Sequence, residues 1–256
     1  MAPGVFILLS ILGTHTCLTS YSLMEVAGKE ISFFSIGQIK DNKEFIATAR
    51  KLERFILKQN NPLATYRLAI QLSSRGFSTK RLERHIIAIA DPKWLVRFAQ
   101  NIPRCSTGLI EQSLLKLDCE PFHLAMFAIA VAGSNKELLE RLVIKSGNPK
   151  AAYICLRYLK HPSVNKIKKI LIQSGKPRYL FALACKLKRK KDITLIEDLI
   201  IESGNATYQR LFAKHIKSAN VERLEAAVIA SGSIKQIRAF AMELKTKRAL
   251  RYSVLD

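Results

Sequence analysis

The sequence predicts an all-α fold, an α-solenoid of about seven stacked helical hairpins. Three observations lead to this prediction: a regular period, a small side chain repeated at one site, and recurring turn residues. The turn after each second helix recurs every 28 to 30 residues, at Pro62, Pro92, Pro121, Pro149, Pro177, Ala206 and Ile234. So regular a period over seven units is typical of a solenoid.

Each of these anchor positions has characteristic neighbours. Six of the seven residues that lie seven positions later are Ala, and the seventh is Leu: Ala69, Ala99, Ala128, Leu156, Ala184, Ala213 and Ala241. A small side chain at this site lets neighbouring helices approach closely. The preceding residue is a helix-capping type in four units, at Asn61, Asp91, Asn148 and Asn205. Two residues before the anchor, the last four units carry a helix-ending glycine, at Gly147, Gly175, Gly204 and Gly232.

In chain order, residues 29–39 are predicted to be the first helix of a degraded unit. Residues 42–58 (NKEFIATARKLERFILK) match a second helix. The clearest hairpin is 135–159, where Asn135 caps one helix, Ser146-Gly147 ends it, and Asn148-Pro149 begins the next. Residues 247–254 are predicted to be a truncated second helix, because terminal units must cover the last apolar face.

The second helices share a pattern in which a Leu or Ile precedes two residues that are mostly charged. We expect the aliphatic residue to be buried and the charged pair to face outward. Glu beside Arg would then form an exposed ladder of ion pairs between units, each contributing at most about 1 kcal/mol. The pattern occurs at Leu52-Glu53-Arg54, Leu82-Glu83-Arg84, Leu139-Glu140-Arg141, Ile167-Lys168-Lys169, Ile196-Glu197-Asp198 and Leu224-Glu225-Ala226.

Between Asn42 and Leu244 the pattern resembles the helical-hairpin repeats grouped as HEAT-like, in a short form of about 28 residues. The phrase KSANVERLEAAVIASG, Lys217 to Gly232, looks like the I-x-S-G repeat arrays of uncharacterised microbial and viral proteins. Ordinary HEAT units are longer, and the tetratricopeptide and ankyrin signatures are not matched. The resemblance implies a HEAT-like superhelix with a binding surface, and it carries over no catalytic residue.

The N-terminus has a different composition. Residues 1–24 carry no Lys, Arg, Asp or Glu, and 5–12 (VFILLSIL) has the length of a signal-peptide core. No basic residue precedes this run and no clear Ala-x-Ala follows it. Residues 1–24 are therefore either a signal peptide or a helix that caps the solenoid, and residues 25–256 form a single repeat domain. No later run approaches the roughly 20 apolar residues of a transmembrane helix.

Five scattered cysteines, Cys17, Cys105, Cys119, Cys155 and Cys185, contain no C-x-x-C pair. We expect them to be reduced and mostly in the core, which favours an intracellular location, cytoplasmic or nuclear. Cleavage of residues 1–20 as a signal would instead indicate secretion.

Charge gives the strongest indication of function. The chain has 42 Lys and Arg against 20 Asp and Glu, a formal charge of +22, which favours a polyanionic partner. Arg141 to Lys191 contains 15 basic residues and no acidic one. The residues predicted to bind nucleic acid or another polyanion are Lys145, Lys150, Arg157, Lys166, Lys168, Lys169, Lys176, Arg178, Lys188, Arg189, Lys190 and Lys191.

Stacked repeats bring equivalent sites roughly 10 Å apart, so Lys150, Arg178 and 166–169 are expected to share one broad surface. Lys outnumbers Arg in this stretch, which favours contact with the phosphate backbone over base reading. Tyr158 and Tyr179 could stack on exposed bases, whereas the register of Tyr153 predicts a core position. The alternatives are docking of an acidic protein and a merely solvated surface.

Other chemistries find little support. The histidines lack H-E-x-x-H spacing, no phosphate-binding glycine loop occurs, and neither metal nor cofactor is expected. A helical-repeat DNA glycosylase would need an Asp and aromatic residues beside a flipped base, and Asp91 with Trp94 offers that combination. Asp91, however, occupies a helix-capping position. The prediction is therefore a non-enzymatic protein that binds nucleic acid backbone, or alternatively a scaffold for an acidic protein; a glycosylase ranks below both.

Overall fold

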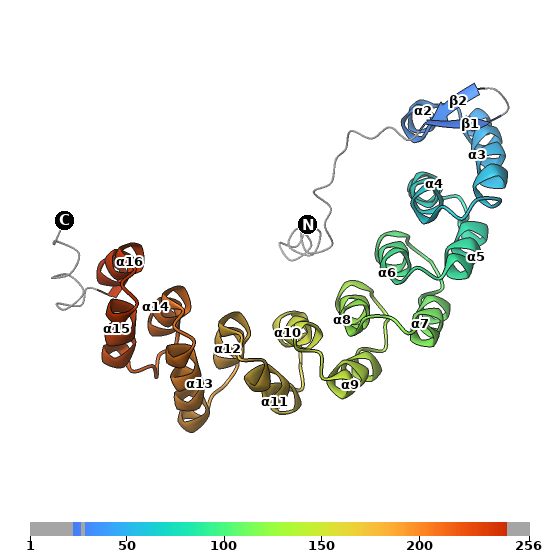
Figure 1. The fold of residues 1–256 in the computed structure, drawn as a ribbon. Coiled ribbons are helices and arrows are strands. Elements are labelled where there is room, and N and C mark those ends of the chain that lie inside the picture. The colour runs from blue at the N-terminus through green and yellow to red at the C-terminus, as the bar shows by residue number, and fades with distance from the viewer. Residues whose placement is uncertain (1–22, 27–28, 245–256) are drawn as a thin grey trace. The chain divides into compact units, whose positions relative to one another are not determined.

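The computed structural model describes residues 23–26 and 29–244, with side chains from Ile36 onward. The described part contains fifteen helices and one two-stranded hairpin (Figure 1). Apart from that hairpin the fold is all-helical, and successive helices pack against one another as an α-solenoid requires. Of the segment 1–24 predicted to be a signal or a capping helix, residues 1–22 lie outside the described residues, as does the predicted helix at 247–254, and Leu23 and Met24 belong to a strand. The array divides into one unit ending at Asn135 and another beginning at Lys136.

The first unit begins with an antiparallel hairpin in which Leu23 pairs with Ser32 and Val26 with Lys29. In this unit α2, α4, α6 and α8 follow one another in one layer, and α3, α5 and α7 lie in the other (Figure 1). Its elements are β1 (Leu23–Val26), β2 (Lys29–Ser32), α2 (Phe33–Gln38), α3 (Asn42–Ile56), α4 (Pro62–Ser74), α5 (Lys80–Ile89), α6 (Pro92–Asn101), α7 (Thr107–Lys116) and α8 (Pro121–Ala130).

The second unit repeats this two-layer arrangement. Helices α10, α12, α14 and α16 contact one another in succession, and α9, α11, α13 and α15 form the other layer (Figure 1). Its elements are α9 (Lys136–Ser146), α10 (Pro149–Tyr158), α11 (Val164–Ser174), α12 (Pro177–Ala184), α13 (Lys190–Glu202), α14 (Ala206–His215), α15 (Val221–Ala230) and α16 (Ile234–Leu244). None of the described helices is long and apolar enough to cross a membrane.

The core lies between the two layers of each unit. The seven positions predicted to be small, from Ala69 to Ala241, are all buried, as close approach of the even-numbered helices requires. Large rings fill the space beside them, including Phe98 and Phe127 in the first unit and Phe212 and Phe240 in the second, all fully buried. Each buried Phe stabilises the fold by about 1.5–3 kcal/mol relative to an exposed one.

Four of the predicted helix caps are confirmed. Asn61, Asp91, Asn148 and Asn205 each accept a hydrogen bond from the backbone N–H three residues later, at 3.0 to 3.3 Å. The four predicted glycines have φ between 62° and 68°, in the left-handed region that favours glycine at a helix end.

The serine before each of these glycines also has a structural role. The Ser146 Oγ donates to the carbonyl of Val143 at 2.6 Å and accepts from the backbone N–H of Asn148 at 3.2 Å. The same pair of bonds occurs at Ser174, Ser203 and Ser231. One hydroxyl thus satisfies the end of an odd-numbered helix and positions the next cap, which explains the recurring Ser-Gly.

Two predictions about single elements need correction. Residues 29–39 do not form one helix, because Lys29–Ser32 is a strand and only Phe33–Gln38 is helical. The described cysteines are not mostly core residues: Cys155 is buried, Cys105 and Cys119 are half-buried, and Cys185 is exposed.

Candidate functional site

All twelve predicted polyanion-binding residues lie in the second unit, distributed over both layers. The odd-numbered helices carry Lys145 on α9, Lys166, Lys168 and Lys169 on α11, and Lys190 and Lys191 on α13. The even-numbered helices carry Lys150 and Arg157 on α10 and Arg178 on α12, whereas Lys176, Lys188 and Arg189 precede helices. Lys150 and Arg178 therefore lie in a different layer from 166–169, with which they were expected to share a surface.

Most of these cations face solvent. Of the fifteen Lys and Arg residues from Arg141 to Lys191, fourteen are exposed. The exception is Lys168, whose side chain is 24% exposed and whose ammonium group pairs with Asp192. The predicted basic tract is thus a real surface feature, except that Lys168 joins two helices.

The glutamates of the second helices do not face outward, which corrects the prediction of exposed ion pairs. Glu53, Glu83, Glu111, Glu140, Glu197 and Glu225 are all buried, at 2–9% exposure. Four of them reach into the next repeat and accept a hydrogen bond from a backbone N–H at or next to the start of its odd-numbered helix. These bonds join Glu83 to Ser106 (3.1 Å), Glu111 to Asn135 (2.9 Å), Glu140 to Ser163 (2.7 Å) and Glu197 to Asn220 (2.8 Å).

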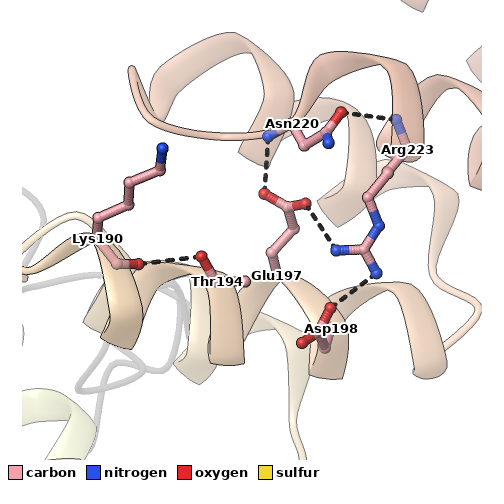
Figure 2. Close-up of polar contacts among 6 residues, drawn as sticks. All are labelled: Lys190, Thr194, Glu197, Asp198, Asn220 and Arg223. Atoms are coloured by element: carbon pink, nitrogen blue, oxygen red, sulfur yellow. Dashed lines mark hydrogen bonds and ion pairs between the residues drawn. The ribbon is translucent and has the colours of Figure 1, made fainter.

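Figure 2 shows this link at α13 and α15. One oxygen of Glu197 accepts from the Asn220 backbone, and the other lies 3.6 Å from the Arg223 guanidinium. Asn220 in turn caps α15 by accepting from the Arg223 backbone N–H at 3.1 Å. The ammonium group of Lys190 lies apart from these contacts (Figure 2).

Burial of these glutamates makes the surface more basic than the composition suggests. In each Glu-Arg pair the Glu points inward and the Arg, at Arg54, Arg84 and Arg141, is exposed. The carboxylates of Glu83 and Glu140 are engaged by backbone N–H groups and that of Glu53 by Arg81, whereas the three guanidinium groups remain accessible to a partner. Sequence reasoning missed this separation because adjacent residues on a helix are only 100° apart and both could have faced solvent.

Between α11 and α13 a lysine takes the place of the buried glutamate. Lys168 occupies the register of the buried glutamates, and Asp192 occupies the register of Ser163 and Asn220. A lysine cannot accept from a backbone N–H, so the contact becomes an ion pair between the side chains of α11 and α13. Lys168 is thus explained by stacking, and the other eleven predicted residues remain candidates for binding.

The exposed cations border a groove between α9 and α11. This groove has a volume of about 580 Å³ and is lined by the side chains of Arg141, Lys145, His161 and Lys166, together with the exposed Glu137, around the link from Glu140 to Ser163. An equivalent groove of about 640 Å³ lies between α3 and α5 in the first unit. Sequence reasoning missed its cations, which become neighbours only when the repeats stack: Arg50, Lys80, Arg81 and Arg84.

A second cluster of cations lies on the even-numbered helices. Tyr153 is 3% exposed, as its register predicts, and its ring stacks on Tyr179 with centroids 4.7 Å apart. Its hydroxyl oxygen accepts from Arg157 Nη1 at 2.7 Å and from Arg178 Nε at 3.2 Å. The hydrogen bond to Tyr153 raises the pKa of both guanidinium groups, which therefore stay charged. One phenol thus holds two positive charges side by side.

The residues considered for base excision have structural explanations. Asp91 Oδ1 accepts from the Trp94 backbone N–H at 3.2 Å and so caps α6. The Trp94 ring packs on Tyr66 at 5.4 Å, with the Arg97 guanidinium 4.9 Å from its centroid. Within the described residues, no group of three His, Cys, Asp or Glu side chains is placed to hold a metal ion. No protein-family model, curated protein or solved structure matches this chain.

Proposed function

We propose that this chain is a non-enzymatic binding protein whose second unit holds nucleic acid through the phosphate backbone. The observation that carries the proposal is the run from Arg141 to Lys191, where fourteen cations are exposed and no acidic residue intervenes. A surface of this kind gains affinity by releasing counterions from the nucleic acid. Lysines predominate in it and act as point charges, which suits contact with phosphates irrespective of base sequence.

The groove between α9 and α11 supports the same proposal. It places Arg141, Lys145 and Lys166 along one concavity, and the carboxylate of Glu140 that lines it already accepts bonds from the backbone and hydroxyl of Ser163. Of the two acids that line the groove, Glu140 thus already has hydrogen-bonded oxygens and Glu137 is exposed, so a phosphate chain would meet three Lys and Arg side chains against one exposed carboxylate. The 28–30-residue spacing and the Ser-Gly turns support placing the array among HEAT-like repeats of the I-x-S-G type. Binding to nucleic acid would imply an intracellular location.

A salt titration tests the proposal. Labelled single and double strands of about 20 nucleotides are titrated with the full chain, and fluorescence anisotropy gives Kd from about 50 to 200 mM salt. We expect micromolar or tighter binding at low salt and a linear fall of log K with log salt. Substituting Lys145, Lys166 and Lys169 together by Gln should reduce the slope for duplex by about 2–3.

A matched variant controls for net charge. Lys43→Gln, Lys217→Gln and Lys235→Gln together remove the same charge at exposed positions outside the grooves and outside the basic tract, and should change the slope far less. An equal decrease of the salt slope in both variants would show that only the net charge of the protein matters. If the unmodified protein binds neither strand at low salt, the proposal fails and an acidic protein becomes the leading candidate partner.

A further inference from the structure

A separate pocket of about 380 Å³ lies on the even-numbered helices of the second unit. It is bounded by Phe181 and Cys185 of α12 and its C-cap, Tyr208 of α14, and the cations Arg157, Arg178 and Lys186. Its volume falls in the range of small-ligand sites. It differs from the groove between α9 and α11 because its exposed surface is predominantly apolar, whereas that of the groove is divided about equally between polar and apolar atoms.

Two cations of this pocket are already held in position without a ligand. Arg157 comes from α10 and Arg178 from α12, and both donate to the Tyr153 hydroxyl. Among the described residues neither guanidinium forms an ion pair, and no Asp or Glu lines the pocket. Two guanidinium groups held together without a carboxylate favour an anion that can accept from both, such as a phosphate.

Aromatic rings form the apolar part. Phe181 and Tyr208 are half-buried, with centroids 6.1 Å apart and ring planes inclined at 52°. His215 meets the Phe181 ring edge-on at 6.2 Å and so holds it from another side. Partly exposed rings next to arginines are the combination that stacks nucleobases in proteins that bind single strands.

We propose that this pocket takes one nucleotide of a single strand, with the base against Phe181 and Tyr208 and its phosphate on Arg157 and Arg178. The inference rests on the proposed function and deepens it, because it assigns a preference for single strands to a defined site. A base in a duplex is stacked and paired on both sides, so only an unpaired base is free to enter.

The test compares two strands with the same number of phosphates. One is an oligothymidine of about twelve nucleotides, and the other replaces every nucleoside by an abasic residue. The unmodified chain should bind oligothymidine about tenfold more tightly or better, because stacking of one base contributes about 1–3 kcal/mol. Tyr208→Leu should remove this preference and leave the salt slope unchanged. Tyr66→Leu, a half-buried ring of α4 in the first unit, is the matched control.

The arginines are tested separately. Arg157→Gln with Arg178→Gln should weaken binding of both strands and reduce the salt slope for single strands by about 1.4. Equal binding of oligothymidine and the abasic strand by the unmodified chain would overturn the pocket and leave the proposed function intact. Binding of neither strand at low salt would overturn both.

A second readout needs no substitution. The exposed Cys185 thiol lines the pocket, so bound oligothymidine should slow its alkylation by iodoacetamide, followed by peptide mass spectrometry, whereas the abasic strand should protect it less. Partial burial of its sulfur raises the pKa of this thiol although the residue as a whole is exposed, so the reaction is run above neutral pH. Cys105, in the first unit, serves as the internal control. Unchanged alkylation of Cys185 in the saturated complex would contradict the proposal.

Discussion

At the scale of single residues, the buried glutamate is the feature that joins one repeat to the next. The first N–H groups of a helix have no partner within it, and a carboxylate from the preceding repeat supplies one. Glu140 satisfies both the backbone N–H and the hydroxyl of Ser163, at 2.7 and 2.9 Å. A residue type usually found on surfaces is therefore part of the interior.

Removing this carboxylate should destabilise the second unit. Glu140→Ala leaves the half-buried N–H and hydroxyl of Ser163 without this acceptor, so we expect the free energy of unfolding in urea to fall by about 1–2 kcal/mol. Glu137→Ala, at an exposed position on the same helix, should change it by about 0.5 kcal/mol or less. Equal effects of the two substitutions would show that the link contributes no stability.

The thiol of Cys155 should make stability depend on alkaline pH. Burial, with a smaller contribution from the charge of Glu140, raises its pKa from 9.0 to about 12. The folded thiol stays protonated where the unfolded one ionises, so this stabilisation is complete below about pH 9 and is lost as pH rises toward 12. Between about pH 8 and 10.5 the unmodified chain should lose about 2 kcal/mol more than Cys155→Ala. Parallel unfolding curves would contradict this prediction.

At the scale of elements, one register position on the odd-numbered helices recurrently supplies the contact to the next repeat. Four links combine a glutamate with a Ser or Asn that directly precedes the next odd-numbered helix: Ser106, Asn135, Ser163 and Asn220. The link from α11 to α13 replaces this combination by Lys168 and Asp192. Lys168 and Asp192 both differ from the residues found at the other links. The attraction between the helices is preserved, although the cation now lies on the earlier helix.

A double-mutant cycle tests whether these two positions act as a pair. Lys168→Glu alone places a carboxylate opposite Asp192, and we expect it to lower the free energy of unfolding by about 1–3 kcal/mol. Adding Asp192→Asn removes the facing negative charge and supplies an amide that can donate to the new carboxylate, and should restore at least about half of the loss. Asp192→Asn alone completes the cycle. Additive effects would show that the two helices are not coupled here.

At the scale of the whole molecule, charge is shared unequally between the two units. Residues 136–244 contain 22 Lys and Arg against nine Asp and Glu, whereas residues 36–135 contain 15 against eight. Both units have a basic groove between odd-numbered helices, but the uninterrupted basic tract belongs to the second. Under the proposed function, the second unit should therefore bind a short strand first.

Charge-neutralised variants of each unit check this order. With a single strand of about ten nucleotides, replacing Lys145, Lys166 and Lys169 by Gln should weaken binding by about tenfold or more at 100 mM salt. Replacing Arg50, Lys80 and Arg84 by Gln in the first unit should weaken it by about threefold or less. Anisotropy on the full chain measures both. A larger loss of affinity in the first-unit variant would show that the first unit, and not the second, binds the short strand first.

The sequence by itself determined the repeated helices between residues 42 and 244, their period and four of their caps. These are local properties: Asn148 needs only its own turn to cap α10, and the spacing of Ala69 to Ala241 follows from identical hairpins packed in the same way. The exposure of the basic tract was also foreseeable, because so many adjacent cations cannot be buried without partners.

Only the tertiary structure decided which charges remain available. Glu140 turns inward because a helix start some 23 residues away presents an N–H group to it, and Lys168 is engaged because Asp192 faces it from the next repeat. The pocket beside Tyr208 likewise needs residues from three helices. Such contacts depend on how one repeat lies on the next, and a single hairpin contains no information about its neighbour's surface until the two are stacked.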